Sequence, residues 1–116
     1  MSQHTFNTTT SSGSRVQVLM GWDRPLQQFF LVVEELDAPE NYDLGDGQET
    51  GDVPYLYSNL SDVDSMGMQD LDYFCEKLRG LGIAIPVLMV KEIEADQLNN
   101  VGNRYVTYNG DGSIRT

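Results

Sequence analysis

The spacing of apolar and polar positions predicts three β-strands in the first half of the chain. From Arg15 to Met20 every second side chain is apolar, which is typical of a strand with one buried face. Residues 21–25 have turn chemistry, and 26–36 contain a continuous apolar run that would bury both faces of a central strand. Residues 53–58 alternate again. Because proline cannot donate a ladder hydrogen bond, Pro54 indicates that this third strand lies at a sheet edge or begins at that residue.

The second half of the chain shows helical spacing. An apolar stripe predicts a helix from an N-cap at Ser65 to about Arg79, with Gly80 just past its end. Residues 83–98 fit a buried strand or a helix, and Pro86 in a first turn favours the helix. Residues 105–108 form a last short strand. With the first two strands as a hairpin, this order predicts an α+β fold, with a small, mostly antiparallel sheet and two helices packed on one face.

Two segments lack this patterning. Residues 1–14 are mainly Ser and Thr, which cannot offset the entropy of ordering, so we expect a disordered N-terminal tail. Residues 37–52 combine three glycines with six carboxylates and are expected to form a mobile acidic loop. Residues 15–116 then make up a single α+β domain, as the length suggests.

Charge is the most unusual property of the composition. The net charge is −11, and all of it arises between Pro25 and Glu76, which contain thirteen carboxylates and no Lys or Arg. Such a surface disfavours direct contact with nucleic acid or an anionic membrane, whose phosphates repel carboxylates. It is compatible with a basic protein partner or a cation.

The carboxylates of the acidic loop recur at every third residue: Asp37, Glu40, Asp43, Asp46, Glu49 and Asp52. In a polyproline II segment this period would place charges about 9 Å apart along one edge. Phosphates along a nucleic-acid strand are closer together, so a nucleic-acid mimic would need further carboxylates from the first helix: Asp70, Asp72 and Glu76. The alternative is a solvated loop whose charges have no partner.

Trp22 completes the set of candidate partner-binding residues. It lies at the turn of the expected hairpin, where it could be an exposed aromatic anchor for a partner. The other interpretation is a lid over one end of the core, with the ring N–H bonded to a local acceptor.

Catalytic and metal-binding patterns are weak. His4 is the only histidine and falls in the expected tail, and Cys75 falls on the apolar stripe of the first helix, where a thiol is usually packing. The acidic run 62–70 resembles a calcium loop at four positions, but Met66 and Tyr73 occupy two positions that need oxygen ligands. No phosphate-binding glycine motif or zinc ligand set occurs, so we expect no metal and no cofactor.

These observations favour a small acidic binding or inhibitory protein that acts on a basic protein, which could itself bind nucleic acid. One alternative is a small carboxylate- or cation-dependent enzyme, in which a pair such as Glu34 and Glu35 would transfer protons. Another is a structural subunit whose tyrosines build a homo-oligomer face: Tyr55, Tyr57, Tyr105 and Tyr108. A single cysteine and the lack of a signal peptide or membrane span predict a cytoplasmic location.

Overall fold

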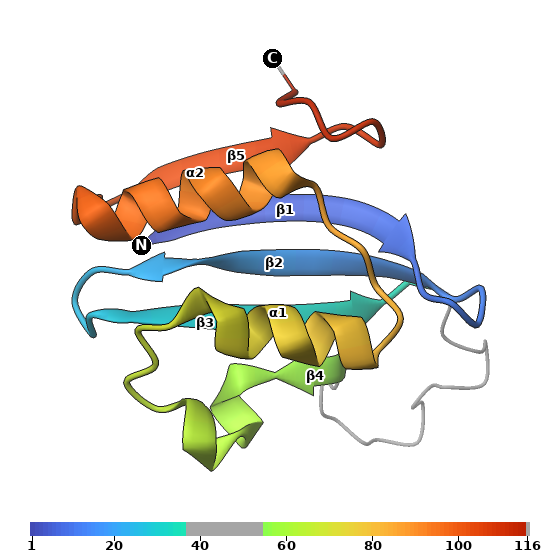
Figure 1. Cartoon of the computed structure of the whole chain (residues 1–116), viewed down its shortest axis with the longest axis horizontal. Helices are drawn as coiled ribbons and strands as arrows, with labels where there is room; N and C mark the ends of the chain where they lie inside the picture. Colours follow the sequence, from blue (N-terminus) through green and yellow to red (C-terminus); the bar gives the residue numbers. More distant parts are fainter. Residues whose placement is uncertain (37–54, 116) are drawn as a thin grey trace, which may run out of the picture.

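The computed structural model describes residues 1–36 and 55–115, so the acidic loop predicted at 37–52 lies outside the described residues. In this part of the chain a five-stranded sheet has the order β4-β3-β2-β1-β5 (Figure 1). The strands are β1 Ser2–Thr9, β2 Arg15–Asp23, β3 Gln28–Glu35, β4 Tyr55–Ser58 and β5 Arg104–Tyr108. Neighbouring strands are antiparallel, except that β1 and β5 are parallel.

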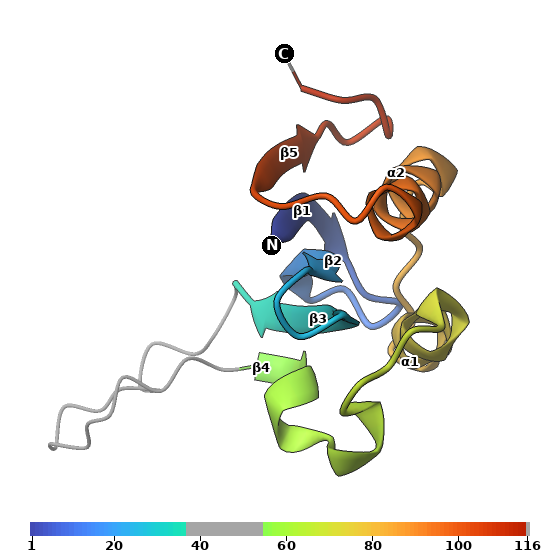
Figure 2. The same ribbon diagram turned by 90° about the vertical axis from the view of Figure 1, so that its left-hand side faces the viewer.

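Two helices, α1 Leu71–Gly80 and α2 Val87–Leu98, lie on the same face of the sheet (Figure 2). Two short 3₁₀ helices, η1 Asn59–Ser61 and η2 Val63–Ser65, connect β4 to α1. The predicted α+β class, the mostly antiparallel sheet and the two helices on one face are therefore confirmed.

The predicted hairpin is the pair β2 and β3, whose register places Val18 opposite Val33 and Trp22 opposite Phe29. Val16, Val18 and Met20 point toward the helices and are fully buried. Both helices lie on one face of the sheet (Figure 2), yet Phe29, Phe30 and Leu31 of β3 are all buried, so the apolar run is buried on both faces of the strand at these positions. β4 is an edge strand, as predicted.

The predicted tail at residues 1–14 is wrong, because Ser2–Thr9 form a strand inside the sheet. β1 pairs with both β2 and β5, so its backbone groups have ladder partners on two sides. Ser2, His4 and Phe6 alternate into the core. Composition was misleading because threonine suits a pleated strand, and the buried polar side chains have hydrogen-bond partners that the sequence does not reveal.

The first helix begins later than predicted. Its N-cap is Asp70, whose carboxylate accepts the amide of Asp72 at 3.0 Å. Ser65 instead ends η2, where its hydroxyl donates to the backbone carbonyls of Asn59 and Asp62. An aspartate and a serine five residues apart are both good caps, so local propensity did not distinguish them.

The helix ends also differ slightly from prediction. Gly80 lies within α1, and Gly82 takes the left-handed conformation with φ 73°. Residues 83–98 contain α2, which begins directly after Pro86, so helix is confirmed over strand. After α2 the left-handed residue is Asn100, with φ 49°.

Candidate functional site

The predicted acidic site is only partly within the described residues. Its loop carboxylates, from Asp37 to Asp52, lie outside them. The other three lie exposed on or beside α1, and none is held in a buried polar network. Asp70 caps the helix, Asp72 lies in its first turn, and Glu76 forms an ion pair with Arg79 one turn later.

Trp22 is a lid and not an exposed anchor, so its assignment to a partner-binding site is wrong. Its side chain is only 2% exposed and packs edge-on against Phe29, with ring centroids 5.1 Å apart. The indole N–H donates to the side-chain oxygen of Asn100 at 3.2 Å. The indole N–H of this tryptophan therefore has its hydrogen-bond partner within the fold.

The acidic segment before α1 also carries a set of exposed apolar side chains that the sequence did not predict. Leu60, Val63 and Met66 are 89%, 78% and 77% exposed, and they occupy every third position of one segment. This period fits neither an α-helix nor a strand, so periodicity did not single them out. We define the acidic–apolar surface as these three residues together with Asp64, Asp70 and Asp72.

The segment that carries these apolar residues is held in place by Asp62. One carboxylate oxygen of Asp62 accepts hydrogen bonds from the hydroxyls of Tyr57, at 2.6 Å, and Tyr73, at 2.7 Å. The other oxygen accepts the backbone amide of Asp64. The two hydroxyls lower the pKa of Asp62, and the bond to Asp62 raises the pKa of Tyr73 to about 12. Asp62 thus links η2 to both β4 and α1.

The same arrangement explains the calcium-like run. Asp62 and Asp70 serve as the caps of η2 and α1, and the tyrosine hydroxyls occupy an oxygen of Asp62. Among the described residues, no three side chains of His, Cys, Asp or Glu converge as a metal-binding group.

A second polar cluster, which the sequence did not predict, surrounds His4 inside the fold. Its Nε2 lies 2.6 Å from a carboxylate oxygen of Asp96, and its Nδ1 lies 2.8 Å from the hydroxyl of Tyr108. Arg104 donates to the other oxygen of Asp96 at 2.6 Å and to Glu92 at 2.7 Å. The cluster joins β1, α2 and β5.

Burial controls the charges of this cluster. Burial lowers the pKa of His4 despite its hydrogen bond to Asp96. Burial alone would raise the pKa of Asp96, but hydrogen bonds from His4, Ser2 and Arg104 outweigh it and lower that pKa. A neutral His4 therefore donates from Nε2 to an ionised Asp96 and accepts the hydroxyl proton of Tyr108 at Nδ1. Since His4 and Asp96 are 0% and 1% exposed, a substrate would not reach either side chain.

The remaining sequence candidates are dispersed. Cys75 is partly buried against the core, as predicted, and burial raises its pKa away from the reactive thiolate. Glu34 and Glu35 are adjacent on β3 and point to opposite faces, so they do not form a pair for proton transfer. The tyrosines are divided between β4 and β5, which are opposite edges of the sheet, and Tyr108 is buried.

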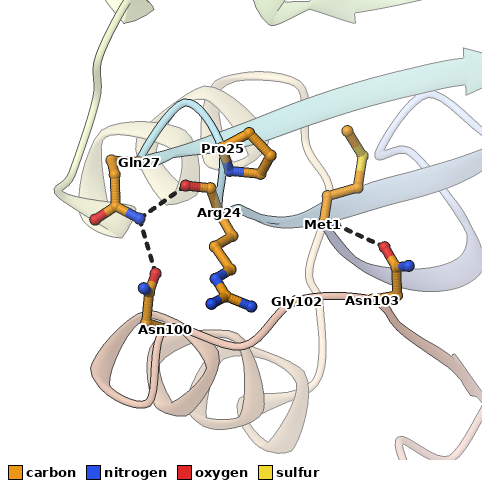
Figure 3. Close-up of a pocket in the computed structure, with 7 residues that line it drawn as sticks. All are labelled: Met1, Arg24, Pro25, Gln27, Asn100, Gly102 and Asn103. Atoms are coloured by element: carbon orange, nitrogen blue, oxygen red, sulfur yellow. Dashed lines mark hydrogen bonds between the residues drawn. The ribbon is translucent and has the colours of Figure 1, made fainter.

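One end of the sheet contains a polar hollow, which we name the Arg24 pocket (Figure 3). Its walls are the β2–β3 turn at 24–27, the α2–β5 connection at 100–103, and Met1. Its volume is about 490 Å³. Gln27 donates from its side-chain nitrogen to the side-chain oxygen of Asn100 at 2.8 Å, which ties the two walls together.

Comparisons with protein-family models, curated proteins and solved structures found no match for this chain. No helix in the described residues is long and apolar enough to cross a bilayer. The function of this chain is therefore inferred from its own geometry.

Proposed function

We propose that this protein is a non-enzymatic binding or inhibitory protein that docks on a basic protein through its acidic–apolar surface. The observation that supports this proposal most directly is the run of Leu60, Val63 and Met66, each more than three-quarters exposed, in an acidic segment. Exposed apolar side chains rimmed by polar groups are typical of protein-interaction sites.

The charge around these side chains defines the partner. Residues 55–76 contain five carboxylates and no Lys or Arg. A complementary surface would carry Lys and Arg around an apolar depression. Unlike charges would steer the encounter, and burial of the apolar side chains would slow dissociation.

The segment is also preorganised for binding. Asp62 fixes η2 through two tyrosine hydroxyls, and Ser65 is buried and bonded to two backbone carbonyls. A partner would therefore meet side chains on a fixed backbone, which reduces the entropy lost on binding.

The test compares matched bait proteins that carry the full chain. One bait has Leu60→Ser, Val63→Ser and Met66→Ser, and a second has Asp64→Asn and Asp72→Asn. A third bait, with Glu34→Gln and Glu35→Gln on β3, is matched to the second in charge. Proteins of the native host captured at low and high salt are identified by mass spectrometry, and association and dissociation rates are then measured with the purified partner.

We expect a basic protein to be retained by the wild type and the β3 control. The basic protein should dissociate faster from the apolar variant than from the wild type. It should associate more slowly with the carboxylate variant, most strongly at low salt. If all baits bind the same proteins with the same rates, the acidic–apolar surface is not the docking site and the proposal is wrong.

A further inference from the structure

The Arg24 pocket has a chemistry opposite to that of the acidic–apolar surface. Arg24 is exposed, and within the described residues its guanidinium has no carboxylate partner. The neighbouring carboxylate, Asp23, is buried and accepts the amide of Leu26. In Figure 3 the side chain of Arg24 extends between Asn100 and Gly102.

The two asparagines that line the pocket, Asn100 and Asn103, have their side-chain oxygens occupied by protein donors, whereas Gln27 uses its side-chain nitrogen as a donor to Arg24 and Asn100. The oxygen of Asn100 accepts from the indole of Trp22 and from Gln27, and the oxygen of Asn103 accepts from the main-chain nitrogen of Met1 at 3.2 Å. The side-chain nitrogens of Asn100 and Asn103 are double donors that meet no acceptor among the described residues. The pocket therefore offers a guanidinium and two amide groups that lack acceptors.

Backbone conformation indicates that this arrangement is built into the fold. Among the described non-glycine residues, Gln27 and Asn100 are those with positive φ, at 53° and 49°. They lie on opposite walls and bond to each other. Such conformations persist where the surroundings fix them, and they concentrate at ligand-binding positions.

The remaining charges do not cancel the pocket's positive character. The amides of Asn100 and Val101 bond to the carbonyls of Gln97 and Asp96, which reduces the negative end of the α2 dipole. The attraction or repulsion exerted by exposed carboxylates in other parts of the molecule is screened by salt beyond about 8–10 Å at physiological ionic strength.

We infer that the Arg24 pocket binds a small molecule that carries a carboxylate or phosphate group. An arginine fork matches the oxygens of either group, and amide donors complete their coordination. The hollow, with a volume of about 490 Å³, is open to solvent, so a small ligand would reach Arg24 directly. The site is separate from the acidic–apolar surface and does not depend on the proposed docking function.

The test is a ¹⁵N NMR titration of the full chain with inorganic phosphate and, separately, with acetate and succinate. We expect saturable shifts of the Arg24 side-chain N–H and of backbone amides at 24–27 and 100–103. Phosphate as the stronger probe identifies a phosphate ligand, and succinate as the stronger probe identifies a carboxylate ligand.

Variants separate this site from general attraction of anions. Arg24→Gln should weaken binding at least about tenfold, because a charge-assisted contact is lost. Asn103→Asp keeps the oxygen that accepts from Met1 but replaces the donor group, so it should also weaken binding. Lys91→Gln removes an exposed cation on α2 and should have no effect. Failure of all three probes to give saturable shifts, or equal binding by Arg24→Gln and wild type, would overturn the inference.

Discussion

Two carboxylates organise polar clusters in this fold, one inside the molecule and one near its surface. Asp96 is 1% exposed and is compensated by Arg104 and by hydrogen bonds from His4 and Ser2. Asp62 is only partly buried and accepts two tyrosine hydroxyls without an ion pair among the described residues. An aspartate inside the fold thus has a cation beside it, whereas solvent and neutral donors suffice at the surface.

The two clusters also differ in what they connect. The bond between His4 and Asp96 joins residues 92 positions apart and fixes β1 against α2. The bonds of Asp62 reach residues five and eleven positions away, within the β4–η2–α1 region. The buried cluster should therefore control global stability, and the surface cluster should control local order.

The largest expected effect is that of Asp96→Ala. This change leaves the buried N–H of His4 and a guanidinium nitrogen of Arg104 without their acceptor, so the free energy of unfolding should fall by about 3–5 kcal/mol. Urea denaturation measures it. Glu92→Ala removes the more exposed of the two carboxylate partners of Arg104, at 30% exposure, and serves as the control, with a loss below about 1 kcal/mol. Equal losses for the two variants would contradict the distinction between the clusters.

A second prediction separates the clusters by pH. The folded-state pKa of His4 is below its ordinary value of 6.5. The stability that neutral His4 contributes is therefore complete above pH 6.5 and is lost as the pH falls through the folded pKa. Over this range the free energy of unfolding should change by no more than about 1.4 kcal/mol per pH unit. The pKa of Asp62 is lowered from 3.8, so its contribution persists until the pH falls below about 4.

His4 is the only histidine, so its ring protons report this titration directly by NMR. A measured pKa above 6.5 would reverse the sign and disprove the neutral state of His4. The unfolding free energy of His4→Gln should show no slope between pH 6.5 and the pKa of His4 in the wild type.

A smaller effect is expected for Tyr57→Phe. The loss of one hydrogen bond to Asp62 should lower the free energy of unfolding by about 1 kcal/mol. Amide hydrogen exchange should become faster in η1 and η2 and stay unchanged in β1, because Asp62 acts locally. Faster exchange in β1 would show that the surface cluster also supports the sheet.

The contrast between the clusters explains what the sequence could predict. Apolar patterning identified β2, β3 and α1, because their apolar faces pack directly on one another, whereas Pro86 favoured a helix over a strand for α2. It missed β1, whose buried Ser2 and His4 are satisfied by partners far along the chain. Of the site, the sequence located the carboxylates of α1, whereas the exposure of Leu60 follows from a 3₁₀ geometry that Asp62 fixes through tertiary contacts.

The smallest expected effect on stability is that of Leu60→Ala, compared with Leu71→Ala eleven residues later. Leu60 is 89% exposed, so its removal should change the free energy of unfolding by less than about 0.5 kcal/mol. Leu71 is buried in the core, and its removal should cost about 2–5 kcal/mol. Urea denaturation of the two variants measures both values.

If Leu60→Ala destabilised the chain as much as Leu71→Ala, Leu60 would be a packing residue, and its place in the acidic–apolar surface would be wrong. A neutral Leu60→Ala that still weakens partner binding would show that Leu60 acts in docking and not in folding.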